Sequence, residues 1–248
     1  MDPLRLLEEA APGADVEPGA AGEVHSDARD EGVPMITTIA SGKGGTGKTT
    51  VAVGLALSLA KSANPAGPLL LDCDVEEPNA ALFLRPTIQE RREVGQLIPQ
   101  VDAGMCTACG RCAEVCQYHA IAVIGERRST AAPVLVFPEL CHGCGSCTLN
   151  CPAEAIREVL HVTGTVERGW SGPVEFAQGT MNVGEPMAVP IIRQLKRWVL
   201  PPGDGDRPII LDASPGTACP VVESMRGADF VLLVTEPTLL LRVICHQS

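Results

Sequence analysis

The sequence Ser41-Gly42-Lys43-Gly44-Gly45-Thr46-Gly47-Lys48-Thr49-Thr50 lies between a β-branched run, 36–39, and an apolar run, 51–60. This order predicts a strand, a glycine loop and a helix. Residues 42–49 satisfy the pattern G-x-x-x-x-G-K-[ST], in which glycines let backbone N–H groups turn inward around phosphate oxygens. The positive end of the following helix faces the same anion. The stretch therefore predicts a phosphate-binding loop, with residues 42–50 contacting ATP.

Two loop side chains have predicted roles toward Mg-ATP. We expect Lys48 to reach the β and γ phosphates, and the Thr49 hydroxyl to contact Mg²⁺. A carboxylate at the end of another strand completes such a metal shell, and Asp212 after the apolar run 208–211 is the candidate. The alternative for Asp212 is an ordinary strand-end carboxylate. In the turn that follows, Gly216 can bring its backbone N–H close to the γ phosphate.

Apolar runs alternate with helical patterns along much of the chain, which favours an α/β fold with a mostly parallel sheet flanked by helices. The run 68–71 predicts a second strand that pairs in parallel with the first as a βαβ unit. Later patterns predict a helix over 191–199 and strands over 209–212 and 230–235. Residues 1–34 are rich in Ala, Gly, Pro, Asp and Glu and predict a disordered acidic tail.

Cysteine is the compositional outlier, with 11 residues in the chain. Clustered cysteines in a reducing compartment favour a metal or redox cofactor over disulfides. Two runs share the spacing C-x₂-C-x₂-C-x₃-C: Cys106, Cys109, Cys112 and Cys116, then Cys141, Cys144, Cys147 and Cys151. The duplication resembles a bacterial ferredoxin with two [4Fe–4S] clusters. This resemblance implies crossed ligand sets: Cys106, Cys109, Cys112 with Cys151, and Cys141, Cys144, Cys147 with Cys116.

Zinc is the competing interpretation of the cysteine runs, because C-x₂-C pairs also form zinc ribbons. A four-ligand zinc site has no use for a third cysteine so close in sequence, which favours iron–sulfur clusters. The first run departs from the ferredoxin pattern by placing Gln117 where proline is usual. We expect His119 and His142 to be exposed or packed rather than ligands, and Cys219 and Cys245 lack a paired spacing.

Lys43 narrows the class of phosphate-binding loop. With this second lysine the loop resembles the deviant one of MinD/ParA-type P-loop ATPases, and the resemblance covers much of 35–238. It implies ATP hydrolysis in a homodimer that sandwiches ATP, where Lys43 stabilises transition-state charge on the partner's nucleotide. It also implies that Asp74, in Asp72-Cys73-Asp74, positions the attacking water. The alternatives are a solvated lysine and a turn-capping aspartate, and we expect Cys73 to pack in the core.

The combined pattern resembles a group of iron–sulfur P-loop ATPases. It implies an ATPase domain in two parts, 35–98 and 160–248, interrupted over 99–159 by a small α+β ferredoxin-like insert with strands near 121–124 and 134–137. Because the insert begins soon after the Asp74 segment, we expect the nucleotide state to gate electron transfer through the clusters. The acceptor is an unidentified redox or cluster-acceptor protein.

Two other functions compete with this one. The clusters could be cargo or a redox sensor, which would make the protein a carrier or regulator in iron–sulfur or metal-cofactor assembly. The third candidate is an ATP-dependent amidating enzyme similar to the cobyrinate diamide synthases, which share this type of loop. It ranks last because no glutaminase-type Cys/His domain follows.

Composition argues against several other classes. Of the 248 residues, 45% are hydrophobic and 20% charged, as in globular proteins. Aromatic residues are only 3% and the net charge is −11, so nucleic acid is not an expected partner. The sequence has neither an apolar run long enough to span a membrane nor a secretory signal, which predicts a cytoplasmic protein.

The sequence departs from the family after Thr238. There the family continues with a helix, a strand and residues that hold adenine, whereas 239–248 reads LLLRVICHQS. We therefore expect an incomplete base pocket. Either the chain is truncated or frameshifted, or it binds nucleotide through the phosphates alone.

Overall fold

The computed structural model describes residues 35–61, 67–124, 133–200 and 207–236. The tail expected over 1–34 and the divergent segment 239–248 lie outside these residues.

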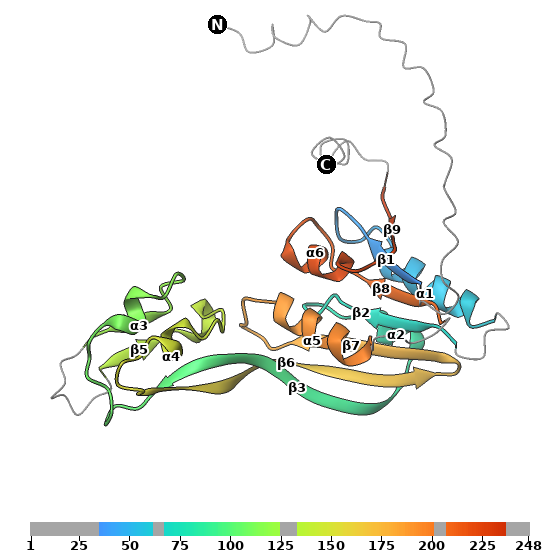
Figure 1. Ribbon diagram of the computed structural model, residues 1–248. Helices are drawn as coiled ribbons and strands as arrows, with labels where there is room; N and C mark the ends of the chain where they lie inside the picture. The colour runs from blue at the N-terminus through green and yellow to red at the C-terminus, as the bar shows by residue number, and fades with distance from the viewer. Residues whose placement is uncertain (1–34, 62–66, 125–132, 201–206, 237–248) are drawn as a thin grey trace, which may run out of the picture. The chain divides into compact units, whose positions relative to one another are not determined.

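A seven-stranded sheet in the order β3-β6-β7-β2-β8-β1-β9 organises the larger part of the described chain (Figure 1). Its strands are β1 Ile36–Ala40, β2 Leu69–Asp72, β3 Thr87–Val101, β6 Ile156–Ser171, β7 Val174–Met181, β8 Ile209–Asp212 and β9 Phe230–Leu233. Pairing is parallel from β7 through β2, β8 and β1 to β9, and antiparallel where β6 joins β7 and β3. The prediction of a mostly parallel sheet is confirmed.

The expected direct pairing of the first two strands is wrong. β8 lies between β1 and β2, with Ile209 opposite both Ile36 and Leu69. A helical crossover makes two strands parallel, but it does not fix how many strands separate them. Because β2 and β8 are buried along their whole length, the centre of the sheet suits both.

Helices cover both faces of the parallel strands. They are α1 Lys48–Leu59, α2 Ala80–Leu84, α5 Val189–Val199 and α6 Cys219–Met225. Successive residues of β2 point to opposite faces, so Leu70 packs with the core beside α1, while Leu69 and Leu71 pack with the core beside α5. Cys73 is fully buried in the α5 core, as expected from the sequence.

A small lobe, residues 102–155, carries the cysteine runs. It contains α3 Arg111–Glu114, β4 Ile121–Val123, β5 Val134–Val136, the 3₁₀ turn η2 Pro138–Leu140 and α4 Ser146–Leu149. β4 and β5 form a separate antiparallel pair, in agreement with the short strands expected there. In Figure 1 the β3–β6 ribbon runs without a break from the large sheet to this lobe. The expected boundaries 98/99 and 159/160 therefore fall inside strands.

Candidate functional site

The phosphate-binding loop and the segment after β2 enclose one pocket, with about 720 Å³ of free space including its open mouth. Gly45 and Gly47 have φ of 81° and 87°, values that side-chain-bearing residues rarely adopt, and Gly47 leads directly into α1. The residues that line the pocket are Ser41, Gly44, Gly45, Thr46, Gly47, Lys48, Thr49, Thr50, Asp74, Glu77, Asn79, Phe83 and Pro215. Glycines, a lysine, hydroxyls and a helix N-terminus are the groups that bind phosphate.

A buried ion pair lies at the base of this loop. Lys48 Nζ donates to Asp212 Oδ1 at 2.7 Å, and the side chains are 7% and 0% exposed. The other carboxylate oxygen of Asp212 is buried and has no protein hydrogen-bond partner among the described residues. Asn79 Oδ1, at the wall of the same pocket, is in the same situation. Asp212 is fully buried and is not among the residues that line the pocket, whereas Asn79 and Thr49 are. The oxygen atoms of these three side chains are of the kind that Mg²⁺ and its bound waters prefer, so their chemistry fits a magnesium site.

Asp74 lies in the pocket, as its predicted role requires. It is half-buried, and this burial raises the pKa of its carboxyl above the usual value, while the charge of Lys48 acts in the opposite direction. Both the pocket position and the nearby lysine are compatible with a carboxylate that contacts a water molecule.

Asp72 has a role that the sequence pattern did not reveal. Its carboxylate accepts hydrogen bonds from the backbone N–H groups of Asp74 at 3.1 Å and of Asn79 and Ala80 at 2.9 Å each. Burial raises the pKa of this carboxyl to about 7 despite these bonds, and the charge of Asp212, its register partner on β8, adds to the effect. Asp72 thus fixes both ends of the loop 74–80, which we call the switch loop.

Three predicted nucleotide contacts lie elsewhere. Gly42, Lys43 and Gly216 are not among the residues that line the pocket. Lys43 is exposed and pairs with Glu236 at 3.0 Å. The Gly216 N–H donates to the Ser41 carbonyl at 2.9 Å, so this donor is engaged within the protein and does not point to the phosphate site.

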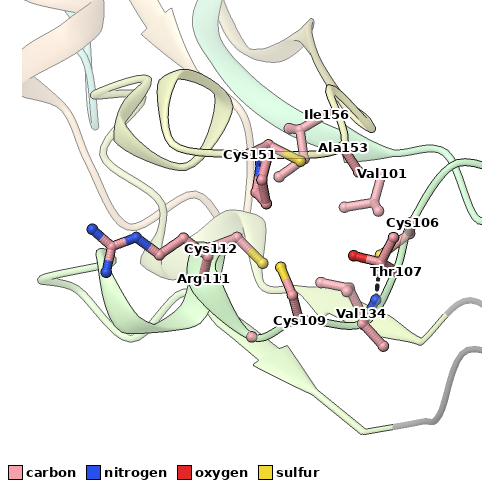
Figure 2. Close-up of a pocket in the computed structure, with 13 residues that line it drawn as sticks. Val101, Cys106, Thr107, Cys109, Arg111, Cys112, Val134, Cys151, Ala153 and Ile156 are labelled. Atoms are coloured by element: carbon pink, nitrogen blue, oxygen red, sulfur yellow. Dashed lines mark hydrogen bonds between the residues drawn. The ribbon is translucent and has the colours of Figure 1, made fainter.

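The small lobe contains two cavities, each lined by four cysteines. The first, with about 330 Å³ of free space, is lined by Cys106, Cys109, Cys112 and Cys151. The second, with about 380 Å³, is lined by Cys116, Cys141, Cys144 and Cys147. Figure 2 shows the sulfurs of Cys109, Cys112 and Cys151 turned toward the same space. Each cavity thus combines three cysteines of one run with the last cysteine of the other, as in the predicted sets.

Backbone amides point at the sulfur atoms at matched places in the two runs. Ala108 N–H donates to Cys106 Sγ at 3.5 Å, and Gly143 N–H donates to Cys141 Sγ at 3.4 Å. After the last cysteine of each run, Ala120 N–H and Ala155 N–H donate to Cys116 and Cys151 at 3.3 Å each. Such N–H···S bonds stabilise thiolate ligands and raise the potential of a bound cluster.

Matched backbone strain accompanies these bonds. Ala108, His119 and Glu154 have φ of 55°, 53° and 50°, in the left-handed region that costs a residue with a side chain about 1–3 kcal/mol. His119 and Glu154 each follow the last cysteine of a run by three positions, and Ala108 corresponds to Gly143, which has φ of 62°. The same strained path in both runs indicates that the loops are shaped to hold the same kind of group.

The cysteines differ in burial and thiol chemistry. Burial raises the pKa of the Cys112, Cys141 and Cys147 thiols, so without a metal they stay protonated at neutral pH. Cys109 and Cys144 are exposed, and the Ser146 hydroxyl lowers the pKa of Cys144. In the described part of the chain, no group of three or more His, Cys, Asp or Glu side chains is arranged to hold a single metal ion.

The chain is similar to several known proteins. Residues 37–215 match the family model described as the CobQ/CobB/MinD/ParA nucleotide binding domain. An uncharacterised protein of Methanocaldococcus jannaschii is 32% identical over 212 residues, covering 84% of this chain and 69% of the relative. An iron–sulfur cluster carrier protein of a Synechocystis species is 50% identical over 52 residues, which are 21% of this chain and 14% of that protein.

One solved structure resembles the chain only loosely. The septum site-determining protein MinD of Pyrococcus horikoshii, determined with Mg-ADP, matches at a TM-score of 0.40 and 16% identity, over 87% of this chain and 66% of its own.

No helix among the described residues is both long and apolar enough to cross a membrane. Because the family model matches more than half of the chain, the chain belongs to the CobQ/CobB/MinD/ParA family of nucleotide-binding domains.

Proposed function

We propose that this protein is an ATPase whose nucleotide state gates electron transfer through two [4Fe–4S] clusters held in the small lobe. The observation that carries the proposal is a pair of hydrogen bonds that connects the switch loop, through the end of β7, to the β3–β6 ribbon that bears this lobe. The Met181 N–H at the end of β7 donates to the carbonyl of Val75, the residue after Asp74, at 2.8 Å.

The link continues into β6. Asn182 N–H donates to the Thr163 carbonyl at 2.9 Å, at the place where β6 stops pairing with β7 and continues with β3 alone. The β3–β6 register shifts at the same level, between Val94 and Gly95. β7 packs tightly against the switch loop, because a Cβ added at Gly179 of β7 would lie only 2.7 Å from Val75 Cγ1. A displacement of Val75 would therefore act on the base of the ribbon.

Nucleotide chemistry follows from the pocket. When ATP binds, Lys48 would exchange Asp212 for the β and γ phosphates, and Mg²⁺ would take its place beside Asp212 and Thr49 and neutralise phosphate charge. Asp74 would orient the water that attacks the γ phosphorus, giving ADP and inorganic phosphate. Lys43, exposed on the loop, is free to exchange Glu236 for a nucleotide on a second subunit, which makes a homodimer part of the proposal.

The small lobe supplies the redox part. We assign 35–98 and 160–248 to the ATPase domain and 99–159 to a ferredoxin-like insert, joined by strands that cross both boundaries. The clusters, when bound, would supply one-electron transfer. The chain's contribution is the crossed thiolate sets, the four N–H···S bonds and the apolar core around Cys112, Cys147 and Ile156. An unidentified redox protein would donate or accept the electron.

The test is metal analysis and EPR on anaerobically purified protein, with ATP turnover measured on the same sample. We expect about eight irons and as many sulfides per chain, coupled [4Fe–4S]⁺ signals after reduction, and a change in these signals on adding Mg-ATP. Zinc with little iron would contradict the cluster assignment. Two full clusters whose EPR spectrum and reduction potential do not change on adding ATP would contradict only the proposed gating.

Asp74→Asn tests the assignment of the water-positioning residue. We expect phosphate release to fall by about 10²- to 10⁴-fold with nucleotide affinity nearly unchanged, because the amide cannot act as a carboxylate toward water. Glu76→Gln, which removes an exposed charge from the same loop, is the control and should keep its rate. Equal rates for Asp74→Asn and the wild type would remove Asp74 from the mechanism.

Asn182→Pro tests the link to the ribbon. Proline removes the N–H that donates to Thr163, so we expect normal ATPase activity and iron content but loss of the ATP-dependent EPR change. The matched control is Asn182→Ala, which keeps this N–H and loses only the side-chain bond to the Val162 carbonyl. If the proline variant still responds to ATP, the link does not carry the signal.

A cluster carrier is the second candidate, favoured by the short but 50% identical match to an iron–sulfur cluster carrier protein and by the exposure of Cys109 and Cys144. Cluster lability separates the two functions. A carrier should pass iron to an apo-ferredoxin in an ATP-dependent way, whereas an electron-transfer ATPase should retain its iron through repeated reduction and oxidation.

A further inference from the structure

The two cysteine cavities are built alike but differ in charge. Residues of the two repeats correspond at the spacing that separates Cys106 from Cys141. By this correspondence, Val134, which lines the first cavity, matches Pro99, which lines the second. Where the cavities differ, the second contains Glu158, and the matching position in the first repeat is Val123. Among the described residues that line the first cavity there is no carboxylate.

Glu158 lies close to the ligand loop of the second cavity. It stands on β6, and its Oε1 is so near the loop that a Cβ added at Gly145 would lie 3.0 Å away. Its charge raises the pKa of the Cys141 thiol, although burial is the larger cause there. It acts in the same direction on Cys144, against the stronger effect of the Ser146 hydroxyl.

The first cavity has the opposite charge. Arg111 is the only charged residue among those described that line it, and Ser146 is the matching residue in the second cavity. Arg111 and Glu158 are both exposed, so solvent weakens the effect of each charge, but the Arg111 guanidinium also pairs with Glu114 at 3.2 Å, whereas Glu158 has no ion-pair partner among the described residues. The carboxylate of Glu158 is therefore the stronger source of asymmetry.

Main-chain hydrogen bonding to sulfur is balanced between the two sites. Each cavity receives two backbone N–H···S bonds of similar length, so hydrogen bonding from the main chain does not distinguish them. The Ser146 hydroxyl, 3.5 Å from Cys144 Sγ, favours extra negative charge at the second site. The Glu158 carboxylate opposes added negative charge at this site. Because a carboxylate has a net charge and a hydroxyl only a dipole, we expect the effect of Glu158 to be the larger.

Building on the proposed function, we propose that Glu158 gives the cluster held by Cys116, Cys141, Cys144 and Cys147 the lower reduction potential of the two. Reduction adds negative charge to a cluster, and a fixed carboxylate at the cavity wall opposes that charge. Glu158 is thus a residue that sets the potential of one site. One electron added to the chain rests in the first cavity, on the set completed by Cys151.

An EPR-monitored redox titration of the holoprotein tests this. The wild type should show two midpoints, and Glu158→Gln should raise the lower one while leaving the upper one in place. The control is Glu139→Gln, an exposed carboxylate of the same lobe that lines neither cavity, which should move neither midpoint appreciably. Identical wild-type midpoints, or an equal shift of both in Glu158→Gln, would overturn the inference.

A second variant guards against poor cluster loading of the first. Arg111→Ser gives the first cavity the residue that the second has, and should lower the upper midpoint alone. A lower midpoint that moves instead would count against the assignment. Iron and sulfide content distinguishes failure of the proposed function from failure of the Glu158 role. Protein without clusters contradicts the proposed function, whereas two full clusters with the wrong pattern of shifts contradict only the role of Glu158.

Discussion

A double variant with Cys106→Ala and Cys151→Ala is expected to keep one intact [4Fe–4S] cluster per chain, whereas Cys106→Ala with Cys116→Ala is expected to keep none. The first pair lines one cavity, although its members come from different runs. The second pair belongs to one run but lines two cavities, so each site loses a thiolate. Because a [4Fe–4S] cluster uses four thiolates, a site with three does not hold an intact one.

The measurement is the spin concentration of the reduced [4Fe–4S]⁺ signal, with iron content beside it. About one spin per chain for the first variant and almost none for the second would establish crossed ligation. The reverse order would show that each run binds its own cluster. Cys219 is exposed and lies outside the small lobe, so Cys219→Ala is the control and should keep the wild-type signal.

Local patterns were sufficient for much of the fold. The β-branched run before the glycine loop forms β1, and the helical pattern over 191–199 lies within α5. Both predictions were correct because the spacing of apolar residues in these segments directly reflects which side chains are buried. The cysteine spacing marked the two runs, and the ferredoxin resemblance implied the two crossed sets that line the cavities. In these segments the chemistry of the residues alone limits the possible structure.

Strands with little burial escaped this reasoning. β3 reads TIQERREVGQLIPQV, and its first seven residues are exposed, so no buried face marks it as a strand. It is held instead by its long pairing with β6, which residues distant in sequence provide. The position of β8 between β1 and β2 is nonlocal in the same way. Sequence patterns report burial, and they do not report which strands are neighbours.

Site residues divide along the same line. The motif predicted roles for Lys48 and Asp212, and the family resemblance implied one for Asp74; Lys48 and Asp74 line the pocket, and Asp212 pairs with Lys48. Their roles toward nucleotide stay predictions. The role of Asp72 depends on the switch loop returning its N–H groups to the carboxylate, which no spacing predicts. Gly216 shows the reverse error, because its N–H is taken by Ser41 once the two loops pack together.

The buried pair at the phosphate-binding loop leads to the second large expected effect. Lys48→Met should lower the free energy of unfolding by about 3–5 kcal/mol, because Asp212 is left as an unpaired buried carboxylate. Asp212→Asn should destabilise similarly by leaving the lysine unpaired. The smaller loss in the range applies if the unpaired group changes its protonation state, which relieves part of the penalty.

Combining Lys48→Met with Asp212→Asn removes both charges, so most of the lost stability should return. We expect ATP hydrolysis to be lost in all three variants, because each lacks the lysine proposed to bind phosphate or the carboxylate proposed to bind magnesium. Urea unfolding without nucleotide and phosphate release on the same samples separate the two roles. Destabilisation in the double variant equal to the sum of the single effects would show that the pair at 2.7 Å is not energetically coupled. Recovery of stability without recovery of activity would show that the charges persist in the core for catalysis rather than for folding.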